Sequence, residues 1–369
     1  MSKAGSSIQP QRLRRLLRKM MDIYSPSGKE EEILAFLHSY LKRHGLPVFQ
    51  QPVDGNRFNI VVAPPDTEIR LALIGHVDTV MAYDLDRFGY EEQQDRIEGL
   101  GAADMKGGCA AMIEAFLALW KNGGHRPPVA LALVVGEEEE GDGSQKLVKD
   151  FHFPWALIGE PTDLKPCLNH YGYIELQITT TGRRMHASLA NMGHNPIEAM
   201  LRLLLKISRY IETQHPETVY NIRDLASSHT GFAVPDRCDS WVDIHLPPTS
   251  PLGAISLELE EIFAAERAEN ADFNGTLRFA TFHGGYELPE KGPIVENLKE
   301  SFALRSLAWE PQAFRSHSDA NLLWASGTKP ILLGPGQLEK AHAPDESIPF
   351  SQVVLAAELY CDFIRKLSE

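Results

Sequence analysis

Short apolar segments alternate with helical patterns over the first part of the chain. Continuous apolar runs at 59–63, 71–74 and 129–135 are bounded by turn residues, which predicts strands buried on both faces. Residues 30–45 carry apolar side chains at helical spacing, and residues 107–120 are small or apolar, so both segments predict helices. Strands that alternate with helices in this way indicate an α/β sheet covered by helices on both faces.

The pattern changes from about Ile174, where strands begin to alternate between apolar and polar positions. The predicted elements are strands at 174–180, 240–246 and 276–281 and helices at 196–213 and 257–267. This order predicts a small α+β domain. We expect it to be inserted as residues 174–286 into a larger domain formed by residues 1–173 and 287–369.

Composition and charge narrow the class of protein. The chain has 369 residues, 43% of them hydrophobic and 23% charged, as in ordinary soluble globular proteins of two domains. The formal net charge of -14 argues against a nucleic-acid partner, because phosphate neutralisation needs clustered Lys and Arg. The sequence shows no apolar run of membrane-spanning length, no signal-peptide pattern and no CxxC pair. We therefore expect a cytoplasmic protein with no membrane contact.

The first candidate metal ligands lie after a predicted strand and in a glycine-rich loop. His76 and Asp78 follow the strand at 71–74, and if they extend it, both point to the same face. Asp78 can then accept the second imidazole N–H and fix which nitrogen faces a metal. Asp104 has glycines on either side, where backbone can approach a cation closely. Its carboxylate is suited to bridging two metals.

Three further signals follow predicted strands. The run Glu137–Glu140 comes directly after a buried strand, Glu160 follows the apolar run at 155–158, and His342 follows the strand at 330–333. Each signal alone has an ordinary explanation, such as a solvated acidic turn or a hydrogen-bonded core histidine. Together the five signals supply two imidazoles and several carboxylates, the ligand set that suits a pair of zinc or similar divalent ions.

In this order the motifs resemble the two-zinc aminoacylase and exopeptidase family. That family includes acetylornithine deacetylase, succinyl-diaminopimelate desuccinylase, glutamate carboxypeptidase and tripeptide aminopeptidase. The resemblance runs from Ser25-Pro26-Ser27-Gly28 to His342 and covers nearly the whole chain. It implies a three-layer αβα metallohydrolase domain with an inserted, ferredoxin-like dimerisation domain, and hence a homodimer.

The resemblance also implies the roles of the ligands. One metal is held by His76 and Glu160, the other by Glu139 and His342, and Asp104 bridges both. In the family the first of two adjacent glutamates is the general base and the second is a metal ligand.

This chain has four consecutive glutamates, so it stays open which two of them form that pair, which we call the register of the pair. We prefer Glu138 as the base and Glu139 as the ligand, because the spacing to Gly141-Asp142-Gly143 then resembles the aminopeptidase pattern. The alternative register makes Glu137 the base and Glu138 the ligand.

The second half of the chain carries both a resemblance to the family and departures from it. His186, within residues 182–188, resembles the family histidine that stabilises the tetrahedral oxyanion, in several members from the partner subunit. Asp243-Ile244-His245 stands where the family often has Asp-x-Arg, so a substrate carboxylate is recognised elsewhere or the substrate differs. His317 is unusual in its segment, and it is either a specificity contact or a surface residue.

The resemblance implies a metal-dependent hydrolase that cleaves an amide bond in a small-molecule substrate. The leading substrate class is an N-acyl amino acid, as in acetylornithine or succinyl-diaminopimelate deacylation, and the expected cofactor is two Zn²⁺, with Co²⁺ as an alternative. A metallo-exopeptidase of the same family is the second hypothesis. A non-catalytic binding protein on this scaffold is the third, but neither the base nor a metal ligand is missing from the sequence.

Overall fold

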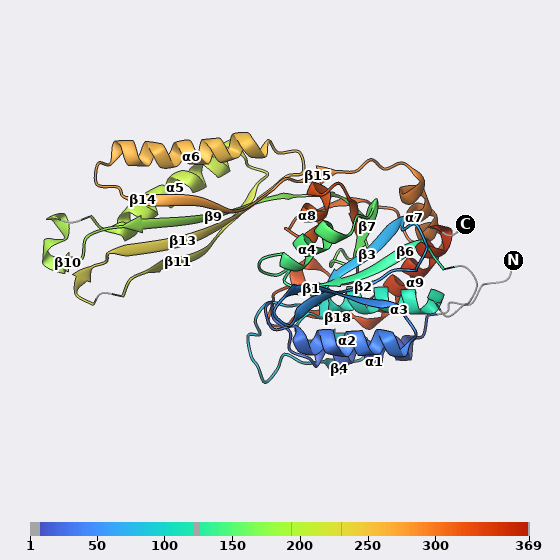
Figure 1. The fold of residues 1–369 in the computed structure, drawn as a ribbon. Coiled ribbons are helices and arrows are strands. Elements are labelled where there is room, and N and C mark those ends of the chain that lie inside the picture. Colours follow the sequence, from blue (N-terminus) through green and yellow to red (C-terminus); the bar gives the residue numbers. More distant parts are fainter. Residues whose placement is uncertain (1–7, 121–125, 193, 230, 368–369) are drawn as a thin grey trace. The chain divides into compact units, whose positions relative to one another are not determined.

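The computed structural model describes residues 8–120, 126–192, 194–229 and 231–367. Contacts between Cα atoms divide the chain into two compact units (Figure 1). The first unit is formed by residues 1–168, 288–314 and 318–369, and the second by residues 169–287 and 315–317. The second unit is therefore an insertion into the first, over nearly the segment where the sequence pattern changes.

The first unit is built on a mixed sheet with the strand order β1-β2-β6-β3-β7-β17-β8, and β16 pairs with β8. The central strands β6, β3, β7 and β17 run parallel to one another, whereas β1, β2 and β8 are antiparallel to their neighbours. Every residue of β3 and β6 is buried, which explains their continuous apolar sequences. The strands are β1 (Val48–Asp54), β2 (Arg57–Val62), β3 (Leu71–His76), β6 (Val129–Val134), β7 (Trp155–Ile158), β8 (Cys167–His170), β16 (Gln312–Phe314) and β17 (Lys329–Leu332).

Helices cover both faces of this sheet. Figure 1 shows α1, α2 and α3 below the sheet and α4 and α8 above it. The helix α3 contacts both α1 and α9, and α4 contacts α8. The helices are α1 (Pro10–Met21), α2 (Glu31–Arg43), α3 (Gly107–Trp120), α4 (Asp142–Asp150), α7 (Pro293–Leu304), α8 (Asp319–Ala325) and α9 (Phe350–Leu367). The predicted α/β class, with its helix-covered sheet, is confirmed.

Three short strands form a separate small sheet in the first unit. The strand order is β18-β5-β4, with antiparallel pairing throughout. The strands are β4 (Glu91–Gln93), β5 (Arg96–Glu98) and β18 (Ser347–Pro349), and a 3-10 turn at Leu338–Lys340 precedes β18. This sheet joins a segment before Asp104 to the segment after His342.

The second unit is an antiparallel sheet with two helices packed on it. Its strand order is β11-β13-β9-β14, and the chain order β9-α5-β11-β13-α6-β14 is the ferredoxin-like order. The elements are β9 (Gly172–Thr181), α5 (Pro196–Gln214), β11 (Val219–Ser227), β13 (Arg237–Leu246), α6 (Leu252–Glu269) and β14 (Gly275–His283). Apolar residues of β9, β13, α5 and α6 form its core. The inserted α+β domain is thus confirmed, with one strand, β11, added to the expected order.

Three shorter pieces complete the second unit. Strand β10 (Met185–His186) pairs with β12 (Ala233–Val234), and a 3-10 turn follows at Ala187–Met192. Strand β15 (Tyr286–Glu287) pairs with the last two residues of β8. Within the described residues, the structure contains no helix that combines the length and the apolar character needed to cross a bilayer.

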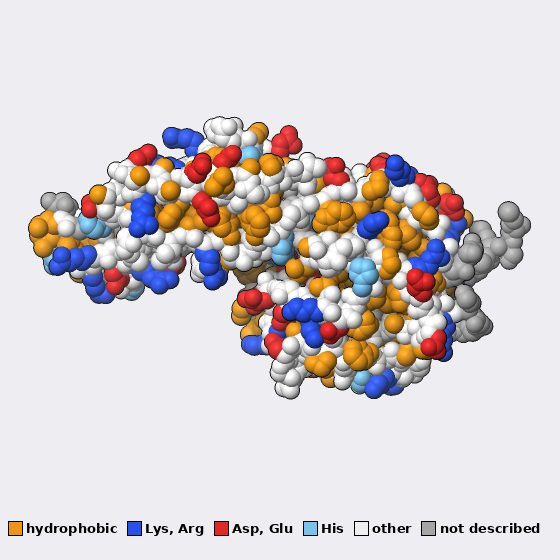
Figure 2. Space-filling view, turned by 45° about the horizontal axis from the view of Figure 1, so that its top comes forward, with side chains coloured by type: hydrophobic (Ala, Val, Ile, Leu, Met, Phe, Trp, Pro, Cys, Tyr) orange, Lys and Arg blue, Asp and Glu red, His pale blue; other side chains and the backbone are white. Residues whose placement is uncertain are grey.

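On the face shown in Figure 2, Lys and Arg side chains alternate with Asp, Glu and apolar side chains, without a broad basic patch among the coloured residues.

A buried ion pair anchors α1 to α3. Arg12 donates from Nε and Nη2 to the two carboxylate oxygens of Glu114, each at 2.7 Å, and the Gln9 backbone N–H also donates to Glu114 Oε1 at 2.7 Å. Glu114 is fully buried and Arg12 nearly so. Because α3 continues directly from the turn that carries Asp104, this pair helps to fix one wall of the candidate site.

We expect Glu114→Ala to lower the free energy of unfolding by about 3–5 kcal/mol, because it leaves the buried guanidinium of Arg12 without a counter-charge. Urea unfolding measures the change. The matched control is Glu32→Ala, which removes an exposed glutamate from α2 and should change the free energy by no more than about 0.5 kcal/mol. Equal unfolding curves for the two variants would contradict the expectation.

Candidate metal centre

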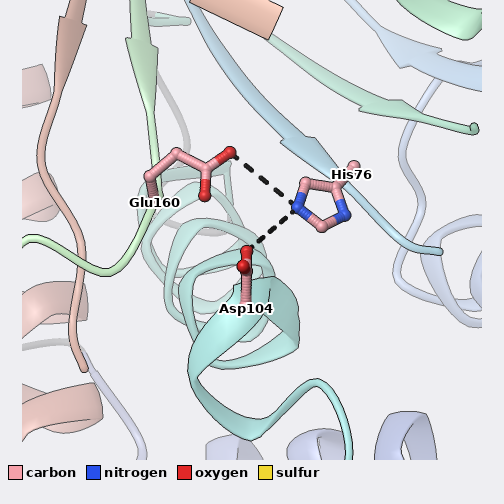
Figure 3. Close-up of side chains that lie close together, drawn as sticks. All are labelled: His76, Asp104 and Glu160. Atoms are coloured by element: carbon pink, nitrogen blue, oxygen red, sulfur yellow. Dashed lines mark hydrogen bonds and ion pairs between the residues drawn. The ribbon is translucent and has the colours of Figure 1, made fainter. Parts of the chain in front are cut away.

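His76, the last residue of β3, lies among carboxylates. Its Nδ1 is 3.1 Å from the backbone carbonyl oxygen of Asp78 and 3.6 Å from Asp78 Oδ1. Its Nε2 lies 3.3 Å from Asp104 Oδ1 and 3.8 Å from Glu160 Oε1 (Figure 3). Acceptors on the Nδ1 side favour the tautomer with the proton on Nδ1. Nε2 then faces two carboxylates, an arrangement that a cation between them would stabilise.

Asp78 is fully buried and held on several sides. Its Oδ2 accepts hydrogen bonds from Ser27 Oγ at 2.7 Å and from the Glu138 backbone N–H at 3.1 Å. Asp78 therefore joins the end of β3 to the start of the acidic run, besides facing His76. From this position Asp78 can orient the imidazole, and its orienting role stays a prediction.

Asp104 lies in a short irregular turn, Ala102–Lys106, that leads into α3. The turn begins after Gly101, whose φ of 75° lies in the left-handed region that favours glycine. Asp104 Oδ1 is 3.3 Å from His76 Nε2, and its Oδ2 is 3.5 Å from His342 Nε2. The carboxylate thus lies between two imidazoles, as a bridging ligand must.

The acidic run divides after its second residue. Glu137 Oε2 lies 3.8 Å from His76 Nε2, and Glu138 Oε2 lies 2.8 Å from His342 Nε2. The turn after β6 then directs Glu139 and Glu140 into solvent, and both are exposed. The structure brings Glu137 and Glu138 to the site but leaves Glu139 outside it. This differs from the preferred register, in which Glu139 is a ligand, and agrees with the alternative.

Two groups of three side chains could each hold a metal ion. They are His76, Asp104 and Glu160, and Asp104, Glu138 and His342, with the candidate ligand atoms of each group within 4.8 Å of one another. Asp104 belongs to both groups. The site therefore has the composition expected for two ions that share one carboxylate.

The buried carboxylates give the site an excess of negative charge that added cations would neutralise. Burial raises the pKa of Glu137, Glu138 and Glu160, and neighbouring carboxylates raise each of them further. Burial by itself would lower the pKa of His76, but the surrounding carboxylates, Asp104 first, raise it well above the ordinary value. Glu160 Oε1 is buried and has no hydrogen-bond partner among the described residues. Divalent cations would neutralise these carboxylates and give that oxygen a partner, so the residues fit a dinuclear centre.

Asp319 is a further acidic residue at the site that the sequence reasoning missed. It is the first residue of α8 and is 2% exposed, and its Oδ1 has no hydrogen-bond partner among the described residues. Burial raises its pKa to about 7, and its charge raises the pKa of Glu137 and Glu160. Its position directly after Ser318, which caps the helix, is the signal that the sequence offers for it.

A cavity of about 420 Å³ opens beside His342. Its walls come from the loop after Asp78, from the residues around Gly99 and from the segment that follows His342. A small molecule bound at the metal-binding residues would therefore have room to extend into the first unit.

The remaining sequence-predicted residues lie in the second unit. His186 is on β10, is exposed, and has Nδ1 2.7 Å from Ser188 Oγ. His245 and His317 both lie against the ring of Tyr173, with centroid distances of 5.1 and 4.9 Å. His317 Nε2 is also 2.9 Å from His283 Nδ1, so His317 is held within this unit by ring contacts and a hydrogen bond.

In the metal-free protein, the hydrogen bond and charge of Glu138 raise the pKa of His342 to about 9. His342 should stay protonated at neutral pH, and the stability that this pair contributes should be lost as the pH rises through about 9. NMR titration of the ring measures this directly. Glu138→Gln should lower the pKa of His342, whereas Glu140→Gln, which changes an exposed neighbour, should leave it in place. An ordinary histidine pKa for His342 in the unaltered, metal-free chain would contradict this account.

Comparison with known proteins identifies the family of the chain. A model of peptidase family M20/M25/M40 matches residues 72–366. An acetylornithine deacetylase of Edwardsiella ictaluri is 30% identical over 354 residues, which cover 90% of each chain. A tripeptidase structure from Staphylococcus aureus has a TM-score of 0.83 at 20% identity and covers 98% of this chain and 99% of that one. A Bacillus subtilis structure described as a dinuclear metal binding peptidase of the M20 family has a TM-score of 0.68 at 12% identity, covering 96% and 97%. The family expected from the motifs is thus confirmed, and the chain is a hydrolase of peptidase family M20/M25/M40.

Proposed function

We propose that this chain is a two-zinc amidohydrolase that removes the acyl group from an N-acyl amino acid. The observation that carries the proposal is the position of Asp104 between two imidazoles, each of which has its own further carboxylate. Similarity to the acetylornithine deacetylase over nine tenths of both chains supports this substrate class. We also propose a homodimer formed through the second unit and a cytoplasmic location, as expected from the sequence.

The proposed ligand sets follow the two groups of side chains. His76, Asp104 and Glu160 would hold one ion, and Asp104, Glu138 and His342 the other. Imidazole nitrogens and carboxylate oxygens suit Zn²⁺, and Co²⁺ could replace it. Such ions, when bound, supply Lewis acidity toward an amide carbonyl and toward water.

Glu137 is our proposed general base. It is nearly buried, and its carboxylate lies next to the first group without belonging to it. Burial raises its pKa, so its carboxylate can accept a proton from water and later release that proton to the leaving amine nitrogen. Asp78 orients His76 and, through the Glu138 N–H, the start of the acidic run. His186 is our proposed oxyanion-stabilising residue.

Three adjacent glutamates make a matched test of the register. Glu137→Gln should keep both metal ions and lower kcat by about 10²- to 10⁴-fold, the range of a lost general base. Glu138→Gln should lose one ion per chain, and Glu139→Gln, changed at an exposed side chain, should keep both metal content and turnover. Metal analysis and kinetics on the same samples distinguish these outcomes. Metal loss in Glu139→Gln, together with full metal content in inactive Glu138→Gln, would instead support the register preferred from the sequence.

The substrate class is tested with a panel of N-acetyl and N-succinyl amino acids, including N-acetylornithine, beside di- and tripeptides. We expect amine release from acyl amino acids by the zinc- or cobalt-loaded protein, and loss of that release with a chelator. Inactive Glu137→Gln is the control for contaminating hydrolases. Release from peptides alone would favour the alternative, a metallo-exopeptidase, and would contradict the deacylase proposal.

A further inference from the structure

Glu346 is a buried carboxylate close to the candidate site but outside both metal-binding groups. It lies four residues after His342 and directly before β18, and it is 4% exposed. A buried carboxylate is costly unless hydrogen bonds or charges compensate it. The hydrogen bonds that compensate Glu346 therefore indicate its structural role in the site.

The carboxylate of Glu346 accepts three hydrogen bonds from the turn that carries Asp104. Its Oε2 accepts from the Gly101 backbone N–H at 2.8 Å, and its Oε1 accepts from the N–H groups of Ala103 at 2.8 Å and Asp104 at 3.0 Å. Three backbone donors that converge on one carboxylate form an anion-binding concavity. Glu346 thus compensates backbone groups that the irregular turn cannot satisfy within itself.

The backbone of Glu346 is fixed as well. Its N–H donates to the Ala343 carbonyl oxygen at 3.1 Å, which closes the turn after His342, and its own carbonyl accepts from the Gly99 N–H at 3.0 Å. The next residue, Ser347, pairs with Glu98 in the small sheet. Glu346 is therefore attached by its main chain to the His342 segment and by its side chain to the Asp104 turn.

We infer that Glu346 is a positioning residue that fixes the Asp104 turn to the His342 segment, so that both side chains reach the same metal ion. The inference rests on the proposed two-metal function. The Asp104–Glu138–His342 group depends on this link for two of its three ligands. The other group takes His76 from the last position of β3 and Glu160 from just after β7, and it depends on Glu346 only through Asp104.

The direct test is titration of the metal-free protein with Co²⁺. Calorimetry and the visible absorption spectrum of the bound Co²⁺ measure each binding step. Glu346→Gln has nearly the same shape but places an amide N–H₂ group among the backbone N–H donors. We expect it to weaken one of the two Co²⁺ binding steps, the one that fills the Asp104–Glu138–His342 group, by about 10- to 100-fold, the range seen for residues that orient ligands, and to change the other step less. Turnover at limiting Co²⁺ should fall and recover with excess Co²⁺, with KM unchanged.

A second measurement, on the metal-free protein, tests the inference even if the two Co²⁺ binding steps cannot be separated. Hydrogen exchange at the Ala103 and Asp104 amides of the metal-free protein should be faster in Glu346→Gln, because their acceptor is altered. The control is Glu339→Gln, an exposed glutamate in the same segment as His342, which should change neither Co²⁺ binding nor exchange.

The outcomes separate the two proposals. Unchanged Co²⁺ binding and unchanged amide exchange in Glu346→Gln would overturn the role of Glu346. Equal weakening of both binding steps would also overturn it as stated, because the link would then not be specific to the Asp104–Glu138–His342 group. Binding of fewer than two ions by the unaltered chain would instead overturn the two-metal proposal itself.

Discussion

The structure depends on negative charge that is gathered and buried at one edge of a sheet. The parallel strands β3, β6 and β7 all end at this edge, so His76, the first glutamates of the acidic run and Glu160 meet there. Asp104, Asp319 and Asp78 add further carboxylates. Carboxylates withdrawn from water repel one another, and two imidazoles cannot neutralise them all. This imbalance makes the edge a site for divalent cations.

The surrounding residues hold this unfavourable arrangement in place. The Asp78 carboxylate is tied to Ser27 and to the Glu138 N–H, and the Asp78 backbone carbonyl oxygen faces Nδ1 of His76, so this one residue contacts both the imidazole and the acidic run. Gly101 allows the sharp start of the Asp104 turn, and Glu346 accepts the N–H groups of that turn. Residues that belong to neither metal-binding group therefore hold the segments that carry the candidate ligands.

The sequence predicted the framework because its signals are local. The fully buried β3 and β6 appear as continuous apolar runs, and chemically active residues follow them directly. The register of the glutamates could not be read in the same way, because it depends on how the turn after Gly136 directs each side chain. Strand β11 was missed because its residues are mostly exposed, so it lacks an apolar pattern. Glu346 and Asp319 act through contacts with segments far away in the chain, which spacing cannot show.

The most direct measurement is the number of divalent ions bound per chain. The protein is stripped with a chelator, reloaded with Zn²⁺ or Co²⁺, freed of excess metal and analysed for metal and protein content. The account predicts two ions per chain, and one for Glu138→Gln. Zero or one ion in the unaltered chain would contradict the central claim that the buried carboxylates form a dinuclear centre.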